Sequence, residues 1–278
     1  MRASAAGLLG DTAGRDYAYK LRLFNAFAEP ELRQAVAGLG IRPGARILDA
    51  GCGTGEALGW LAAAAGARGL VVGLDLASAH IAAAREAAAS GTAVVQANLL
   101  SPPLASGTFD LIWAVNTVNH LRDADAGLAR ITPLLTAGGR LALGQSALLP
   151  EMYFAWDARL ERLTHEAVRR YYRARYGLEE RELTGVRAIV GLLRRAGLRE
   201  VSVRSFLIER VAPLRPADEA YLLEAIFRRT WGERLRPYLS SEDYEELARL
   251  CDPDDPHYAL RRPDFHFLQS FTLAVGML

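Results

Sequence analysis

A run of alternating glycines near residue 50 constrains the fold of this chain more than any other feature. Residues 46–56 read Arg-Ile-Leu-Asp-Ala-Gly-Cys-Gly-Thr-Gly-Glu, so that the glycines are Gly51, Gly53 and Gly55. The apolar pair before Asp49 is typical of a buried strand, and the Ala- and Leu-rich residues after position 56 are typical of a helix. Glycine at every second position indicates a tight turn between them. The order strand, turn, helix predicts an α/β fold.

Such a turn suits a ligand that carries charges of both signs. Glycine lets backbone N–H groups approach a ligand closely, and the N-terminus of the following helix attracts anionic groups. Asp49 adds a negative charge at the end of the strand, and Cys52 lies inside the turn. A dinucleotide fingerprint would need glycine at position 56, where this chain has Glu56. A turn with a purely structural role remains the alternative.

Polar residues also follow the next two predicted strands. Residues 70–74 form a short apolar run, typical of a strand covered on both faces, and the run stops at Asp75. A crossover would bring Asp75 level with the glycine turn, where its carboxylate can accept hydrogen bonds from a ribose diol. A helix cap is the alternative, because residues 77–89 read as helix. The third predicted strand, residues 94–97, leads into Asn98 and Leu99.

The remaining elements are predicted from periodicity. Residues 109–115 form the fourth strand and lead into Asn116 and then into Asn119-His120-Leu121. The other predicted elements are a helix over 16–39 that Pro30 interrupts, a helix over 123–135, a turn at Gly138-Gly139, a strand over 140–144, helical structure over 151–176 and a strand over 271–276.

Together these features resemble the class I S-adenosylmethionine (SAM) dependent methyltransferases. The resemblance rests on the Asp-x-Gly-x-Gly-x-Gly run, on Asp75 after the second strand, on the Phe-Asp-Leu start of the fourth strand and on the Asn-His-Leu that follows it. It covers five strands, from about residue 46 to 145. It implies a Rossmann-like seven-stranded, mostly parallel sheet with helices on both faces, helical lid insertions, and a last strand that runs antiparallel between the fifth and sixth.

The resemblance also implies a binding site for SAM. The glycine turn would wrap the methionine part, Asp75 would hold the ribose, and Asn98 and the Leu99 N–H would hold the adenine. The family usually has Asp where this chain has Asn98, which removes a charge, and an Asx-turn is the alternative role. Tyr19 and Tyr17 would face the methionine end or act as packing aromatics. The expected cofactor-binding residues are Asp49, Gly51, Cys52, Gly53, Gly55, Asp75, Leu76, Asn98, Leu99, Asn116 and Tyr19.

The expected domain organisation is a core with helical additions. Its parts are an N-terminal helical segment (1–40), a SAM-binding core (41–147), a helical lid insertion (148–183), a core helix and strand (184–212), a second helical insertion (213–263) and a final antiparallel strand (264–278). The insertions would exclude water and shape the acceptor pocket. Their aromatic residues suit an apolar or aromatic acceptor or, taken singly, belong to the core: Tyr153, Phe154, Trp156, Tyr171, Tyr172 and Trp231.

Methyl transfer from SAM requires alignment more than covalent help. Positioning contributes on the order of 7 to 11 kcal/mol, and a general base is optional. His120 is the candidate base, because it follows the fourth strand and imidazole titrates near neutral pH. A packing role at a helix start is the alternative. No cluster of His, Cys or carboxylate residues has metal-ligand spacing, so no metal is expected.

Composition limits the kinds of partner that this chain is expected to bind. A net charge of +1 provides no field that would gather nucleic acid, and glutamates interleave the Arg-rich residues 151–176, as on a solvated helix face. No stretch approaches the roughly 20 apolar residues of a membrane span. Cys52 and Cys251 lack any paired spacing, which fits a cytoplasmic location. Lys20 is the only lysine, which fits a GC-rich coding bias. A homodimer remains open.

The leading prediction is a SAM-dependent methyltransferase that acts at O, N or C of a small molecule, as in bacterial specialised metabolism. Two alternatives stay open. One is a SAM-binding enzyme of the same fold with a non-methylating reaction such as cyclisation. The other is a SAM-binding protein without catalysis.

Overall fold

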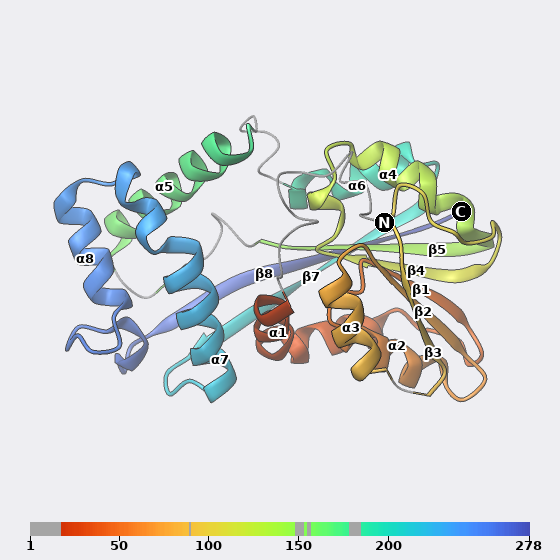
Figure 1. The fold of residues 1–278 in the computed structure, drawn as a ribbon, viewed down its shortest axis with the longest axis horizontal. Helices are drawn as coiled ribbons and strands as arrows, with labels where there is room; N and C mark the ends of the chain where they lie inside the picture. Colours follow the sequence, from red (N-terminus) through yellow and green to blue (C-terminus); the bar gives the residue numbers. More distant parts are fainter. Residues whose placement is uncertain (1–17, 89, 148–152, 155–156, 178–184) are drawn as a thin grey trace.

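The computed structural model describes residues 18–88, 90–147, 153–154, 157–177 and 185–278, and it shows a mixed β-sheet flanked by helices with a helical lobe at one end (Figure 1). Across the sheet the order is β3 (Thr92–Gln96), β2 (Leu70–Asp75), β1 (Arg46–Ala50), β4 (Phe109–Val115), β5 (Leu135–Ser146), β8 (His266–Met277) and β7 (Arg199–Val211). A two-residue strand, β6 (Tyr153–Phe154), pairs with β8 beyond the end of β5.

Strand directions agree with the predicted topology. The first five strands in this order are parallel, whereas β8 runs antiparallel to both β5 and β7. The last strand therefore lies between the fifth and sixth long strands, as the family resemblance implied. The fold class is confirmed, with β6 as a short addition.

Alternation along the strands explains why both faces carry helices. Ile47 of β1 is fully buried on one face with α1 (Ala18–Gly38) and α2 (Glu56–Ala65), where one residue of α3 (Ser78–Glu86) also packs. Its neighbour Leu48 is fully buried on the opposite face with α4 (Ala124–Ile131) and α6 (Gly185–Arg195). Successive side chains of a strand point to opposite faces, so a strand covered twice is apolar at adjacent positions.

The helical lobe is assembled from both insertions. It contains α5 (Ala158–Tyr176), α7 (Pro216–Ala220), a π-helix η5 (Tyr221–Trp231), the 3₁₀ helices η6 (Glu233–Tyr238) and η7 (Ala259–Arg261), and α8 (Ser241–Cys251). The two long strands β7 and β8 extend from the sheet into this lobe (Figure 1). Asp157 and Ser240 accept hydrogen bonds from backbone N–H groups in the first turns of α5 and α8, respectively, so both helices begin at side-chain caps.

The π-helix changes which residues of the second insertion face the core. In the sequence, Ala220, Leu223, Ile226 and Phe227 lie at the spacing of one α-helical face, but Ala220 and Leu223 are only partly buried. The buried residues fall in three groups separated by four to five positions: Tyr221 and Leu222, Ala225 to Phe227, and Thr230 and Trp231. This spacing matches the wider turn of a π-helix rather than the 3.6-residue turn of an α-helix.

Four local predictions were wrong in detail. Pro30 lies inside α1 without ending it, because its φ suits a helix, only one backbone hydrogen bond is lost, and Phe27 and Leu32 are held in the core. The Gly138-Gly139 pair lies within β5, where the register against β4 shifts, as at a bulge. The helix predicted over 123–135 ends at Ile131 and continues as the 3₁₀ helix η3 (Thr132–Leu134). Residues 153–154 are strand rather than helix, since β8 offers them a pairing edge.

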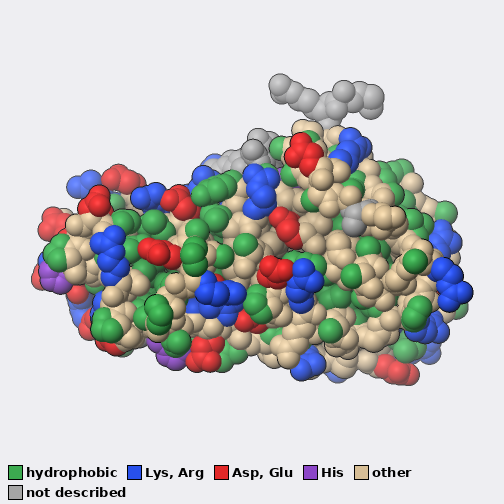
Figure 2. All heavy atoms as spheres, turned by 90° about the horizontal axis from the view of Figure 1, so that it is seen from below, with side chains coloured by type: hydrophobic (Ala, Val, Ile, Leu, Met, Phe, Trp, Pro, Cys, Tyr) green, Lys and Arg blue, Asp and Glu red, His purple; other side chains and the backbone are tan. Residues whose placement is uncertain are grey.

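The surface carries both charge signs. On the face in Figure 2, arginine and acidic side chains interleave over the whole molecule. The Arg-rich α5 buries Leu160, Thr164, Ala167 and Val168 and presents its arginines outward, as expected for a solvated amphipathic helix. Within the described ranges, no helix is long and apolar enough to cross a bilayer.

Candidate functional site

The glycine turn joins β1 to α2 at the carboxyl edge of the sheet. Gly51, Gly53 and Gly55 have φ values of 85°, 53° and 92°, which are positions that favour glycine. At Gly51 an added Cβ would also lie 2.3 Å from Oγ1 of Thr117, so this position tolerates no side chain. The predicted turn is therefore present with the backbone conformation that its glycines require.

Asp49 is a buried carboxylate at the end of β1. Its exposed fraction is 2%, and its Oδ2 atom has no hydrogen-bond partner. Burial, together with the nearby charges of Asp75 and Glu56, raises the pKa of Asp49 to about 8. Three carboxyl groups therefore gather at this turn, and a cation placed among them would be stabilised.

Asp75 ties the glycine turn to α3. Its Oδ2 accepts a hydrogen bond from the N–H of Gly53 at 3.0 Å, and its Oδ1 accepts one from the N–H of Ala77 at 2.9 Å and lies 3.2 Å from Nδ1 of His80. Burial opposes ionisation, but the hydrogen bonds from His80, Ala77 and Gly53 outweigh it and lower the pKa of Asp75. Asp75 thus lies beside the turn as expected, and its bond to Ala77 lies just before α3, whose first turn has no side-chain cap. Its contact with ribose stays a prediction.

The residues after β3 are partly engaged within the protein. Oδ1 of Asn98 accepts a hydrogen bond from the N–H of Leu100 at 2.9 Å, which is the Asx-turn considered as an alternative. The side chain of Leu99 is buried in the core, and the carbonyl of Leu76 accepts a hydrogen bond from Gln96 at 3.1 Å. These contacts leave the adenine contacts of Asn98 and Leu99 as predictions.

The end of β4 is fixed to the end of β5 by Asn116. This residue has a φ of 53°. Its Oδ1 accepts a hydrogen bond from the N–H of Ser146 at 2.7 Å, and its Nδ2 donates one to Oγ of Ser146 at 3.1 Å. The side-chain amide thus joins the carboxyl ends of β4 and β5, at the sheet edge that holds the glycine turn.

His120 closes the 3₁₀ helix η2 (Val118–His120), which follows β4. The residue is exposed, yet protein atoms around the imidazole lower its pKa by desolvation, and the charges of Lys20 and His80 lower it further against the opposing charge of Asp75. His120 is therefore within electrostatic range of the carboxylate beside the glycine turn.

Tyr19 lies on the first turn of α1 with 44% of its surface exposed, and the guanidinium of Arg229 lies 5.3 Å from the centre of its ring. Tyr17, Trp156 and the side chains of Tyr153 and Phe154 lie outside the described residues. Trp231 is fully buried, which makes it a core residue, and Tyr171 and Tyr172 pack partly buried against the core.

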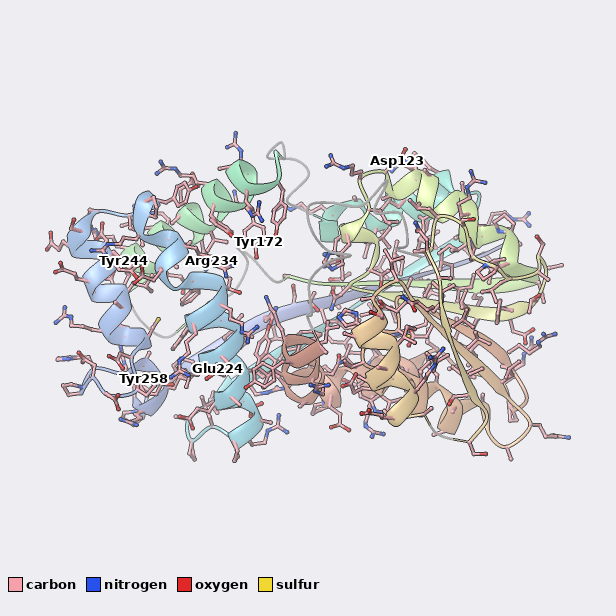
Figure 3. All side chains as sticks on the ribbon, viewed as in Figure 1. Asp123, Tyr172, Glu224, Arg234, Tyr244 and Tyr258 are labelled. Carbon is pink, nitrogen blue, oxygen red and sulfur yellow. The ribbon has the colours of Figure 1, made fainter. Side chains whose placement is uncertain are left out.

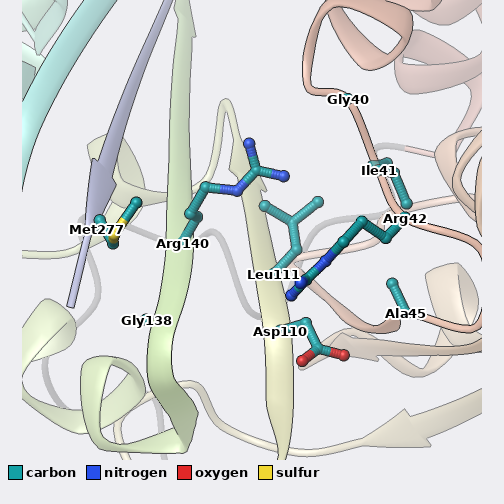
Figure 4. Close-up of a pocket in the computed structure, with 9 residues that line it drawn as sticks. All are labelled: Gly40, Ile41, Arg42, Ala45, Asp110, Leu111, Gly138, Arg140 and Met277. Atoms are coloured by element: carbon teal, nitrogen blue, oxygen red, sulfur yellow. The ribbon is translucent and has the colours of Figure 1, made fainter.

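A separate cleft lies at the opposite edge of the sheet (Figure 4). It measures about 330 Å³, and Arg42, Asp110 and Arg140 line it near the amino ends of β4 and β5. Arg140 donates to the carbonyl of Leu39 at 2.7 Å, and Asp110 accepts from the N–H of Arg46 at 2.9 Å. Ligands of open α/β sheets bind at the carboxyl ends of strands, so this cleft is not the candidate site.

Comparison with known proteins supports the resemblance to methyltransferases that the sequence indicated. Residues 47–139 match a family model described as a methyltransferase domain. The chain is 36% identical over 121 residues to nocamycin O-methyltransferase from Saccharothrix syringae, a match that covers 42% of this chain and 43% of the relative. Residues 47–139 are therefore identified as a methyltransferase domain.

Solved structures extend the likeness in fold beyond this methyltransferase domain. A SAM-dependent methyltransferase from Aquifex aeolicus has a TM-score of 0.51 at 19% identity, with 69% of this chain and 92% of that chain covered. The [4+2]-cyclase SpnF has a TM-score of 0.54 at 17% identity, with 99% of this chain and 98% of that chain covered. At these identities the likeness concerns the fold. In sequence, the matches span less than half the length of curated relatives, from 39% to 47%.

Three residues around the candidate site were given no role there by the sequence reasoning. Thr117 fills the space beside Gly51, and Glu56 accepts hydrogen bonds from Thr54 and Asn25 at the start of α2. No sequence pattern singles out either residue. Lys20, which interacts electrostatically with His120, was noted as the only lysine but was attributed to coding bias rather than to the site. In the part of the chain that the structure describes, no three His, Cys or acidic residues are grouped as metal ligands.

Proposed function

We propose that this chain is a SAM-dependent methyltransferase whose acceptor is a small molecule. The methyltransferase domain at residues 47–139 supports the reaction class, and the nocamycin O-methyltransferase relative makes oxygen the first candidate among O, N and C. The helical lobe is the proposed lid and acceptor pocket, with the domain boundaries expected from the sequence. A cytoplasmic location fits the absence of a disulfide between Cys52 and Cys251.

The observation that carries the proposal is the unpartnered Oδ2 of Asp49. Among the described residues this buried oxygen has no hydrogen-bond donor, and Asp75 and Glu56 add negative charge around it. SAM carries an ammonium and a sulfonium charge, so its methionine part would supply the missing cation. Its own carboxylate would meet the backbone N–H groups of the turn at Gly51 to Gly55. The residues present therefore fit the cofactor.

Bound SAM supplies a methyl group that is already activated for displacement. The residues of the chain then hold and align the reactants. We propose that Asp75 holds the ribose and that Asn98 and the Leu99 backbone hold the adenine. Alignment of the acceptor under the helical lobe contributes on the order of 7 to 11 kcal/mol.

We propose His120 as the base for a hydroxyl acceptor. Its lowered pKa keeps the imidazole neutral near pH 7, so that it can accept the proton that the hydroxyl loses. Its exposed position is compatible with contact to a small molecule.

Two other functions receive less support. The likeness to a cyclase concerns the fold alone, since identity is 17%. A protein that only binds SAM would not need the exposed, neutral imidazole of His120 beside the cofactor site. Both are separated from methyl transfer by the experiment below.

The proposed test combines binding and transfer. Calorimetry with S-adenosylhomocysteine, the demethylated product, should show binding to the wild-type protein and weakened binding to Asp49→Asn. Asp125→Asn, which alters an exposed carboxylate paired with Arg195, is the matched control. Incubation with methyl-labelled SAM and candidate acceptors should then place the label on one product. Absence of binding refutes the proposal, conversion without label indicates cyclisation, and binding without any conversion indicates a regulatory protein.

A further inference from the structure

Three cationic side chains meet where α1 of the core contacts the helical lobe. Lys20 lies on α1, Arg229 on η5 and Arg234 on η6, and these residues are called the cationic cluster below. The ammonium of Lys20 lies 3.5 Å from Oγ1 of Thr230, which is buried in η5. Burial, together with the charges of Arg234 and Arg229, lowers the pKa of Lys20 to about 8, so both arginines lie within electrostatic range of Lys20.

Among the residues that the structure describes, the cationic cluster has no acidic partner. Within the described ranges, no ion pair is recorded for Lys20, Arg229 or Arg234, and no carboxylate contributes to the pKa of Lys20. Elsewhere arginines of this chain commonly form such pairs, and Arg228, the residue before Arg229, pairs with Glu224. Three neighbouring cations without a carboxylate repel one another, and an added anion would relieve that repulsion.

Aromatic rings hold the two guanidinium groups and leave their N–H edges available. The guanidinium carbon of Arg229 lies 5.3 Å from the ring centre of Tyr19, and that of Arg234 lies 5.2 Å from the ring centre of Tyr171. Such contacts use the face of the guanidinium, whereas its five N–H donors point outward in the plane. Figure 3 shows the labelled Arg234 on the helical lobe. The edges of both arginines thus remain able to bind an anion bidentately.

The cationic cluster is adjacent to the candidate active site. Leu21, the neighbour of Lys20, reaches the glycine turn, because a Cβ added at Gly53 would lie 3.1 Å from Cδ1 of Leu21. The charge of Lys20 also acts on the imidazole of His120. The cluster therefore lies between the glycine turn and the helical lobe, where the acceptor of the proposed reaction would bind.

We propose that Lys20, Arg229 and Arg234 bind an anionic group, a carboxylate or a phosphate, on the methyl acceptor. The inference rests on the proposed function and narrows its substrate class from small molecules in general to small acids. Lys20 is the central residue, since its ammonium is largely removed from water and gains most from an anion.

The single lysine makes a direct test possible. Lysine labelled with ¹³C yields one set of lysine side-chain signals, whose pH titration reports the pKa of Lys20 in the protein saturated with S-adenosylhomocysteine. The probes are benzoate, phenyl phosphate and the neutral, similarly shaped benzamide. Saturating benzoate or phenyl phosphate should raise the Lys20 pKa by about one, a tenfold gain in proton affinity, whereas benzamide should not. The anion with the larger effect identifies the acidic group.

Variants complete the test. Lys20→Gln and Arg234→Gln should each weaken binding of the preferred anion about tenfold without changing benzamide binding, and Arg228→Gln is the control outside the cluster. Equal binding of anions and benzamide, or an unchanged Lys20 pKa, overturns the inference. Binding of S-adenosylhomocysteine is measured on every variant, so its absence from the wild-type protein refutes the proposed function, whereas binding without anion preference refutes only this inference.

Discussion

The N–H of Gly53 donates a hydrogen bond to Oδ2 of Asp75 at 3.0 Å, and this contact joins the first βα turn to the carboxyl end of the second strand. A residue proposed to hold ribose is therefore also part of the structure that shapes the methionine site. Substitution of Asp75 acts on both at once.

Asp75→Ala should weaken binding of S-adenosylhomocysteine by about 1 to 3 kcal/mol, because the proposed ribose bonds are lost and the N–H groups of Gly53 and Ala77 lose their acceptor. Calorimetry measures the change in affinity. Unchanged affinity would remove Asp75 from the site.

Asp49→Asn should flatten the pH dependence of stability in the ligand-free protein. The folded-state pKa of about 8 lies above the value of about 4 expected in the unfolded chain, so the folded state binds more protons between these values. The free energy of unfolding should then fall as pH rises across this window, with a contribution of up to ~1.4 kcal/mol per pH unit. Denaturant unfolding of both proteins at several pH values measures it. Parallel curves would show that Asp49 ionises normally.

Gly51→Ala should lower both the free energy of unfolding and the affinity for S-adenosylhomocysteine, because the new Cβ would overlap the side chain of Thr117 and φ is 85°. Adding Thr117→Ala removes the nearest overlapping atoms and should restore part of the loss, leaving a cost of about 1 kcal/mol from the left-handed backbone. A double-mutant cycle by thermal unfolding measures the coupling, and strictly additive effects would contradict the contact.

His120→Ala should slow turnover of a hydroxyl acceptor by about 10²- to 10⁴-fold while leaving S-adenosylhomocysteine affinity nearly unchanged. Single-turnover kinetics separates the two effects. If the rate is unaffected, His120 is a packing residue and alignment alone accounts for catalysis.

Arg210→Ala should destabilise the protein by about 3 to 5 kcal/mol, because the largely buried guanidinium pairs with Glu31 on α1 and Asp218 on α7, and both carboxylates would lose it. Arg195→Ala, which breaks an exposed pair with Asp125, is the control and should change stability little. Denaturant unfolding compares them. If both variants lower the free energy of unfolding equally, the ion pairs of Arg210 stabilise the protein no more than a surface pair does.

The sequence predicted the sheet and the turn because both follow from local patterns. Adjacent buried residues such as Ile47 and Leu48 mark a strand covered on both faces, and Gly51 requires a positive φ whatever the rest of the chain does. The wider turn of η5 was not predictable, because the α-helical and π-helical spacings place similar numbers of apolar residues inward. Nor was the hydrogen bond from Gly53 to Asp75, because it joins two strand ends that are 22 residues apart in the chain. Lys20 was attributed to codon usage because its neighbours Arg229 and Arg234 are more than two hundred residues away in the chain.

The continuity of β7 and β8 from the sheet into the helical lobe has a mechanical consequence. Two hydrogen-bonded strands resist bending far more than a flexible tether does, so the lobe cannot swing away as a hinged flap. Any chimaera that transplants the lobe from a relative would have to cut both strands at paired positions, such as Ser205 and Thr272, to keep the ladder in register.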